Sequence, residues 1–156
     1  MMNNDYIMRI IEHFFKALAS IIHSRKAENY EEASNQIKMA SRYYLKTDLA
    51  LLEFSRPEQL LEHFKSYTND IDYERCILCA DLLHELALLK TTPEEAKRLK
   101  ISSLYLYITA LPKQPQFQNE DYFRKTSSLI EELQIHLHGH DIQEKLKSYR
   151  KFLTGN

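Results

Sequence analysis

The segment from residue 6 to residue 22 is apolar apart from one narrow stripe of polar side chains. These polar positions recur every three or four residues, which is the spacing of one face of an α-helix. They are Arg9, Glu12, His13, Lys16, Ser20 and His23. The pattern predicts a helix that Asn4 or Asp5 caps and that ends near Ser24. Because the polar stripe is narrow, we expect this helix to be covered on more than one side, either inside the fold or across a dimer interface.

The rest of the chain shows further stretches of helical spacing separated by short connections. Capping residues and prolines mark their limits. The expected helices cover residues 30–46, 48–54, 57–67, 72–90, 93–111, 121–138 and 141–153. Seven or eight helices with short links predict antiparallel helix pairs. We therefore expect a single all-α domain over residues 1–156.

Several helix ends carry recognisable capping residues. Ser55-Arg56-Pro57-Glu58 and Thr92-Pro93-Glu94-Glu95 fit a capping box with proline in the first turn. Asp70 or Asp72 is expected to start the long apolar helix that ends near Lys90. Asn119 or Asp121 is expected to start the helix after the loop at residues 112–119. Gly139 is expected to end that helix in the left-handed conformation.

Glycine is scarce, and this narrows the possible functions. The chain has only Gly139 and Gly155, where average usage would give roughly eleven in a chain of this length. Phosphate-binding loops, nucleophile elbows and tight hairpins use glycine for positive φ or close backbone approach. With none before Gly139, the sequence excludes a dinucleotide fingerprint, a Walker A loop and most all-β folds. It has 44% apolar and 28% charged residues, which is typical of a folded globular chain.

The balance of charge argues against strong attraction to nucleic acid or to a membrane surface. The formal net charge is −1. A basic cluster near the end of the chain consists of Lys145, Lys147, Arg150 and Lys151. Cations in a last helical turn stabilise the helix dipole, so capping is favoured there over nucleic-acid binding, which stays the second alternative. The first residues lack a basic region and a cleavage site, and charges interrupt the apolar stretch after them, so we expect a cytoplasmic protein with no membrane span.

A weak internal sequence repeat supports a repeated helical arrangement. Pro57-Glu58 and Pro93-Glu94 each follow an Ala-Leu-Leu triplet, and the prolines lie 36 residues apart. This spacing is close to the 34-residue period of tetratricopeptide repeats, although the consensus Trp, Gly and Tyr positions do not match.

Two segments resemble a known group of proteins. They are Asn4-Asp5-Tyr6-Ile7-Met8-Arg9-Ile10-Ile11-Glu12, with Phe14, Phe15 and Leu18 after it, and His84-Glu85-Leu86 leading into Thr92-Pro93-Glu94-Glu95. The chain resembles a group of small bacterial cytoplasmic proteins of unknown function that look like degenerate tetratricopeptide-type helical proteins. The similarity is strongest in the first helix, moderate to residue 111 and weak beyond it. The resemblance implies a tetratricopeptide-like helical array and brings no established activity.

Two clusters contain residues that can bind metals or react. Cys76-Ile77-Leu78-Cys79 lies about a turn inside an expected helix beside acidic residues, so core packing is favoured over redox chemistry. His136, His138, His140 and Asp141 are ligand types that suit zinc or nickel. Side chains two apart on a helix point away from each other, but a turn at Gly139 would let His138 and His140 approach. A metal-binding protein or enzyme that uses these four residues is the first alternative function.

The aromatic residues favour a binding role. Tyr43, Tyr44, Tyr105 and Tyr107 lie in expected helices, and tyrosine suits half-buried seams and protein interfaces. We find no grouping typical of hydrolases or di-iron bundles, and adjacent His84 and Glu85 diverge on a helix. The leading prediction is a non-enzymatic module without a cofactor. It binds a protein or peptide through these four tyrosines and dimerises through the first helix.

Overall fold

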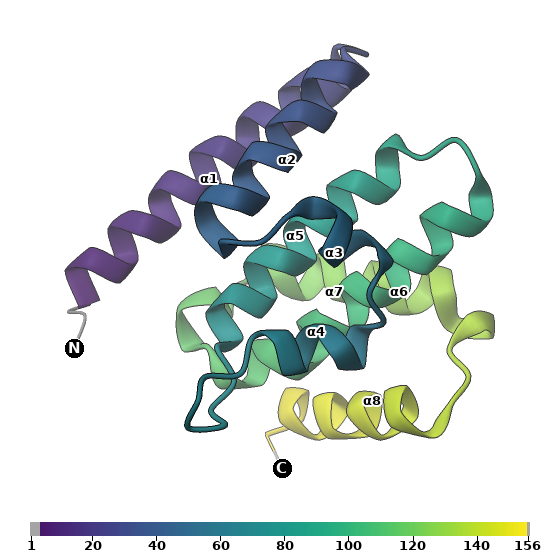
Figure 1. The fold of residues 1–156 in the computed structure, drawn as a ribbon. Coiled ribbons are helices and arrows are strands. Elements are labelled where there is room, and N and C mark those ends of the chain that lie inside the picture. The colour runs from purple at the N-terminus through teal and green to yellow at the C-terminus, as the bar shows by residue number, and fades with distance from the viewer. Residues whose placement is uncertain (1–3, 156) are drawn as a thin grey trace.

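The computed structural model describes residues 4–155, so part of the amino-terminal segment discussed above lies outside it. The structure is 82% helical, and the described residues form eight α-helices and no strand. This confirms the predicted all-α class (Figure 1). The α-helices are α1 (Asn4–Lys26), α2 (Tyr30–Leu45), α3 (Leu49–Phe54), α4 (Pro57–His63), α5 (Tyr73–Leu89), α6 (Pro93–Ala110), α7 (Glu120–Leu133) and α8 (His140–Leu153). Three single-turn 3₁₀ helices connect them, η1 (Leu111–Lys113), η2 (Pro115–Phe117) and η3 (Gln134–His136).

The α5–α6 pair forms the centre of the core. In α5, eleven of seventeen residues are buried, and in α6 the run from Ser102 to Ile108 is buried without interruption. A helix that is apolar nearly all round must be enclosed by neighbours. Accordingly α5 contacts α1, α2, α3 and α6, while α6 also contacts α4, α7 and α8. Consecutive helices pack together in the α1–α2 and α5–α6 pairs, and the tetratricopeptide-like arrangement stays a prediction.

The α1–α2 hairpin packs one of its faces on α5 and leaves the opposite face in solvent (Figure 1). The buried residues of α1 form one stripe of helical spacing: Ile11, Phe14, Leu18, Ile21 and Ser24. Tyr6, Met8 and Phe15 remain exposed. Within this chain α1 contacts both α2 and α5, and the Phe15 ring also lies against the rings of Phe117 and Tyr122. The apolar surface of α1 is therefore covered in part by the fold itself, and dimerisation through this helix stays a prediction.

Most of the expected helix limits are confirmed within two residues, and the ends of two helices differ. The helix that starts at Pro57 ends at His63, because residues 64–72 form turns around a bridge between Lys65 and Ile71. Helix α7 ends at Leu133 and is followed by η3. Gly139 has the expected positive φ, +98°, but it precedes α8 as its N-cap instead of ending α7.

Side chains cap some helix starts and leave others without a side-chain cap. Asp72 Oδ1 accepts from the backbone N–H of Arg75, and Asn119 Oδ1 accepts from that of Tyr122 at 3.1 Å. Thr92 occupies the N-cap of α6 without such a bond. Ser55 donates to the carbonyl of Leu51, so the cap of α4 falls one residue later, on Arg56, whose N–H donates to the Gln59 side chain.

This difference predicts different effects of two alanine substitutions. Asn119→Ala removes the acceptor at the start of α7 and is expected to lower the free energy of unfolding by about 1 kcal/mol. Thr92→Ala is the matched control, because its side chain accepts no capping bond, and we expect a change below about 0.5 kcal/mol. Urea denaturation followed by circular dichroism measures both. Equal losses for the two variants would contradict the assignment of the cap.

Candidate protein-binding surface

The solvent face of the α1–α2 hairpin carries a groove that follows both helices. A pocket of about 280 Å³ with apolar walls forms its centre, and a second of about 220 Å³ continues it toward the start of α1. We define the α1–α2 groove by the residues that line these pockets, which are Tyr6, Arg9, Ile10, His13, Ala17, Ser20, Gln36, Met39, Ala40, Tyr43 and Tyr44.

The floor of the groove is held in place by ring packing and one hydrogen bond. Tyr44 is buried, and its hydroxyl forms a hydrogen bond with His13 Nδ1. The ring of Phe14 meets the ring of Tyr44 edge-on, with centroids 5.2 Å apart and planes at 90°. Burial, followed by the neighbouring Tyr43, raises the pKa of Tyr44 above its ordinary value. The floor is therefore a preformed surface with a neutral tyrosine at neutral pH.

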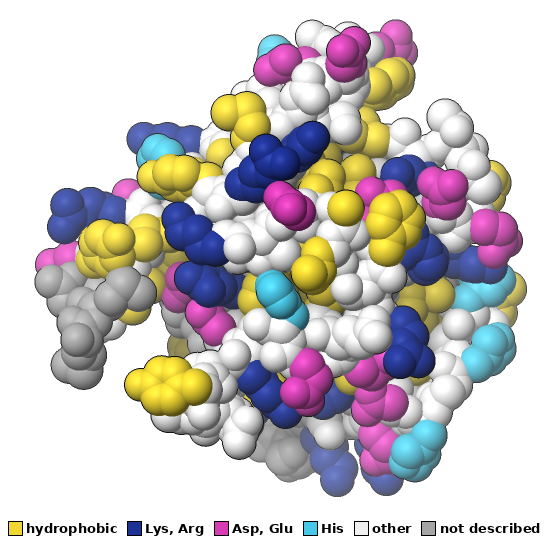
Figure 2. Space-filling model, in the orientation of Figure 1, with side chains coloured by type: hydrophobic (Ala, Val, Ile, Leu, Met, Phe, Trp, Pro, Cys, Tyr) yellow, Lys and Arg dark blue, Asp and Glu magenta, His cyan; other side chains and the backbone are white. Residues whose placement is uncertain are grey.

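The rim of the groove exposes large apolar side chains. Met39 is 69% exposed and Tyr43 is 62% exposed. The Lys46 ammonium lies 5.2 Å from the centre of the Tyr43 ring, and this contact steadies the aromatic side chain. Figure 2 shows apolar side chains interspersed with basic ones over the hairpin. Methionine and tyrosine around an apolar hollow are typical of protein interfaces.

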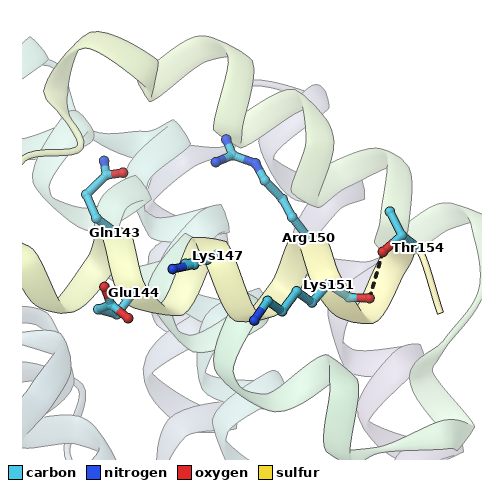
Figure 3. Close-up of a pocket in the computed structure, with 6 residues that line it drawn as sticks. All are labelled: Gln143, Glu144, Lys147, Arg150, Lys151 and Thr154. Atoms are coloured by element: carbon cyan, nitrogen blue, oxygen red, sulfur yellow. Dashed lines mark hydrogen bonds between the residues drawn. The ribbon is translucent and has the colours of Figure 1, made fainter. Parts of the chain in front are cut away.

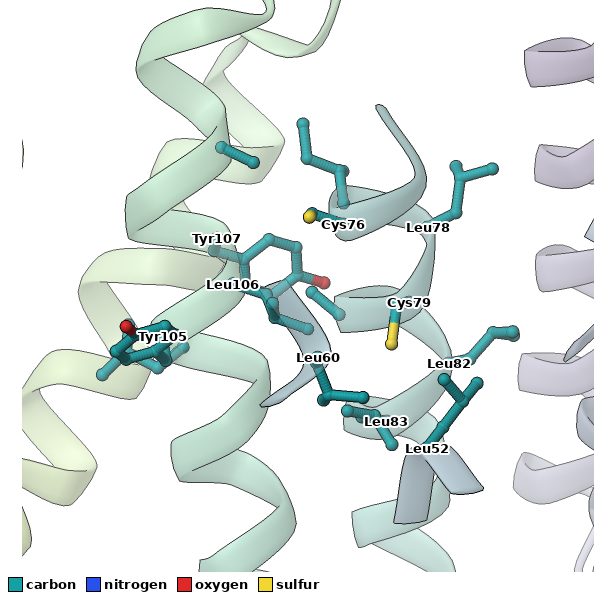
Figure 4. Packing of buried hydrophobic residues seen from close by; sticks show 14 of the residues in the cluster. Leu52, Leu60, Cys76, Leu78, Cys79, Leu82, Leu83, Tyr105, Leu106 and Tyr107 are labelled. Carbon is teal, nitrogen blue, oxygen red and sulfur yellow. The ribbon is translucent and has the colours of Figure 1, made fainter. Parts of the chain in front are cut away.

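Two of the four predicted contact tyrosines lie far from this groove. Tyr105 and Tyr107 are both buried. Side chains two positions apart on a helix point in different directions, but neighbouring helices cover α6 on both of these sides. Tyr105 donates to Asp141 of α8, and Tyr107 donates to Asp81 of α5. Figure 4 shows the Tyr107 ring between α6 and α5, among the core leucines. The four tyrosines therefore do not form one surface, and only Tyr43 is exposed.

The histidine cluster is not arranged as a metal centre. His136 is half-buried on η3, while His138 and His140 are exposed on either side of Gly139. Asp141 accepts a hydrogen bond from Tyr105. Within residues 4–155, no three His, Cys, Asp or Glu side chains come close enough to hold a metal ion. The turn at Gly139 does not bring the imidazoles together, because α7 ends at Leu133 and the histidines fall on different elements.

The two cysteines are core residues. Cys76 and Cys79 are both reduced and buried in α5 (Figure 4). Burial first, and the charge of Asp72 second, raise the pKa of the Cys76 thiol to about 12. Burial also raises the pKa of Cys79 well above its ordinary value. At neutral pH both are thiols and not thiolates, so neither is activated as a nucleophile or metal ligand.

The basic cluster near the end of the chain forms a shallow surface on α8. A hollow of about 570 Å³ is lined by Gln143, Glu144, Lys147, Arg150, Lys151 and Thr154, as Figure 3 shows. Arg150 and Lys151 occupy the last turn of α8, where cations stabilise the helix dipole. Lys145 lies apart from this hollow, with its ammonium 5.9 Å from the centre of the Tyr105 ring. The four basic residues thus divide between two surroundings, and Glu144 offsets part of their charge.

A buried polar cluster, which the sequence did not predict, ties three helices together. The side chain of Asp81 in α5 is fully buried. It accepts hydrogen bonds from the hydroxyls of Tyr107 in α6 and Tyr122 in α7, the latter at 2.7 Å. Lys125 Nζ lies 3.3 Å from both Asp81 Oδ1 and the Tyr107 hydroxyl. Burial, followed by the charge of Asp81, raises the pKa of both tyrosines. Since the chain itself supplies these partners, the cluster is complete without a ligand.

A second buried charge fixes the hairpin to the core. Glu85 of α5 is 3% exposed, and Arg25 at the end of α1 donates to it from Nε at 2.8 Å. His84 Nδ1 lies 3.8 Å from the other carboxylate oxygen. Burial raises the pKa of Glu85, but its contacts with His84 and Arg25 outweigh burial and leave it below its ordinary value. The sequence could have indicated both clusters, because Asp81 and Glu85 are acidic residues within an otherwise mostly apolar helix.

Comparisons with known proteins add no relative to this description. No protein-family model, no curated protein and no solved structure matches the chain. The resemblance to a tetratricopeptide-like bacterial group therefore stays a prediction. No helix between residues 4 and 155 is long and apolar enough to cross a membrane.

Proposed function

We propose that this chain is a non-enzymatic protein-binding module of the cytoplasm and that its partner places a helix in the α1–α2 groove. The observation that carries the proposal is the exposure of Met39 and Tyr43 beside an apolar hollow on a rigid helix pair. Apolar hollows with exposed methionine and aromatic rims are favoured docking sites, because binding removes their apolar surface from water.

The shape of the groove favours a helical occupant. Its lining residues recur every three or four positions along both α1 and α2, so it follows the helix axes. An amphipathic helix that lies in such a groove presents anchors at the same spacing. The small side chains Ala17, Ser20 and Ala40 leave room for those anchors. From Tyr6 to Ser20 the groove extends about 21 Å, the length of roughly four helical turns.

Site-specific photocrosslinking in cells tests this proposal. A photoreactive amino acid replaces Met39 in one variant and Ile135 in the other; Ile135 is 76% exposed and lies on η3, away from the groove. We expect a discrete protein adduct from position 39 and none from position 135, because only the groove binds a partner. Adding Tyr43→Glu should reduce the adduct at position 39 severalfold. Equal labelling at both positions, or no adduct at position 39, would overturn the proposal.

A further inference from the structure

We infer that the protein docked in the α1–α2 groove is a second copy of this chain, with its α2 antiparallel to the first. This inference rests on the proposed function, because it names the partner of the same groove. The two α2 helices pack side by side about a two-fold axis at Met39, each lying along the groove of the other copy. The hairpins then form a four-helix bundle.

The charges along α2 favour this arrangement. On α2, Gln36, Met39 and Tyr43 line the groove, and exposed Glu32 precedes Gln36 by four residues, which is the spacing of one helix face. At the other end Lys46 is the C-cap of α2, and its ammonium lies over the ring of Tyr43. Glu32 and Lys46 each lie seven residues from Met39 and have opposite charge. Among the described residues neither forms an ion pair within its own chain, although Lys46 also lies over the Tyr43 ring. A two-fold axis at Met39 places Glu32 of each copy beside the partner's Lys46. The dimer therefore gains two equivalent ion pairs between the copies.

The shape of the hairpin face is also self-complementary, because the same face carries both projections and a hollow. Met39 and Tyr43 project from α2, and the small side chains Ala17 and Ser20 line the hollow on α1. In the two-fold arrangement each copy supplies both the projecting residues and the hollow. The contact is isologous, so it closes at two copies instead of growing into a filament.

The size of the face fits a dimer of moderate strength. The hairpin face is about 30 Å long, from the helix rise, and two helices wide, about 20 Å. Covering it removes roughly 600 Å² from each copy, which is at the lower end of the areas that specific interfaces bury. We therefore expect dissociation in the micromolar range.

Charge reversal at the two ends tests the pairing. In Glu32→Lys both pairs become repulsive, and the same holds for Lys46→Glu. Each single variant should dimerise about ten- to thirty-fold more weakly, because an exposed pair contributes little by itself but two attractive pairs become repulsive at once. The double variant E32K/K46E should regain dimerisation near the original strength. An equimolar mixture of the two single variants should form the heterodimer in preference to either homodimer. Sedimentation velocity over a concentration series, with one variant labelled, measures all four.

The controls separate this inference from the proposed function. Glu131→Lys and Lys147→Glu reverse exposed charges on α7 and α8 and should leave dimerisation unchanged. Met39→Arg puts two like charges at the axis and should weaken the dimer at least about 100-fold while the circular dichroism spectrum stays the same.

A monomer at all concentrations, together with an adduct of another protein at position 39, would overturn the inference of a second copy and keep the protein-binding function. A dimer indifferent to both single reversals would overturn the antiparallel pairing.

Discussion

Asp81→Ala is expected to lower the free energy of unfolding by about 3–5 kcal/mol, the range found when one partner of a buried charge pair is removed. The substitution leaves the Tyr107 and Tyr122 hydroxyls without an acceptor and the Lys125 ammonium without its counter-ion. Because these groups come from α6 and α7, the loss affects the contact of both helices with α5. Chemical denaturation followed by circular dichroism measures it.

Two further variants establish that the loss comes from unpaired polar groups. Glu131→Ala removes an exposed carboxylate from α7 and should change stability by less than about 0.5 kcal/mol. Asp81→Leu combined with Lys125→Met replaces the ion pair by apolar groups and should lose less than Asp81→Ala, since no buried charge is stranded. If the double variant is as unstable as Asp81→Ala, the ion pair is not the cause.

The same cluster predicts how stability changes at high pH. In the folded chain the pKa values of Tyr107 and Tyr122 lie above the ordinary value of 10.0. Above pH 10 the unfolded chain therefore releases these protons and the folded chain retains them. The folded state binds more protons in this window, so stability falls as pH rises. Tyr122→Phe should make that fall less steep.

Local order was predictable from the sequence because helical spacing and capping depend on residues close together in the chain. Asn119 and Asp72, one of the two candidates given for each helix start, cap α7 and α5, and the expected apolar helix ending near Lys90 is present as α5. Tyr43 and Tyr44 were both predicted as contact residues, but adjacent positions on a helix face different directions, and Tyr43 is exposed while Tyr44 is buried.

Long-range pairings were not predictable, because they depend on which helices surround α5 and α6. Asp81 accepts a hydrogen bond from Tyr122, which is 41 residues distant in the sequence. Glu85 accepts one from Arg25, at a separation of 60 residues. Nothing in a single sequence specifies which of many polar residues meets a given acid. For the same reason the burial of Tyr105 and Tyr107 was missed, since it follows from α8 covering one side of α6 and α5 with α7 covering the other. The groove was anticipated only in part, through Tyr43, Tyr44 and the large apolar surface of the first helix.

Arg25→Met is expected to lower the free energy of unfolding by about 3–5 kcal/mol at pH 7, because it leaves the Glu85 carboxylate buried without its cation. The affected contact joins α1 to α5, so the hairpin should lose protection from hydrogen exchange before the α5–α6 pair does. Hydrogen exchange with mass spectrometry, combined with urea denaturation, measures both effects.

Arg42→Met is the matched control, because it removes the same side chain from an exposed ion pair with Asp48. Side chains in that pair are 61% and 72% exposed, so we expect a loss of no more than about 1 kcal/mol. Equal losses in the two arginine variants would contradict a special role of the buried pair. In the combined variant Arg25→Met with Glu85→Leu, much of the stability should return, because no charge is then stranded.

The stability of the arginine variant should depend less on acidic pH than that of the natural chain. With Arg25 present, the pKa of Glu85 is below its ordinary value of 4.5, so its stabilising contribution is present above that pH and is lost as pH falls through the folded value. Arg25→Met removes the hydrogen bond and the charge of the guanidinium but keeps the contact with His84, so the pKa of Glu85 rises. The difference in stability between the natural chain and Arg25→Met should therefore shrink as the pH is lowered below about 5, which urea denaturation at several pH values measures. A constant difference over that interval would show that Glu85 has found another cation or water in the variant.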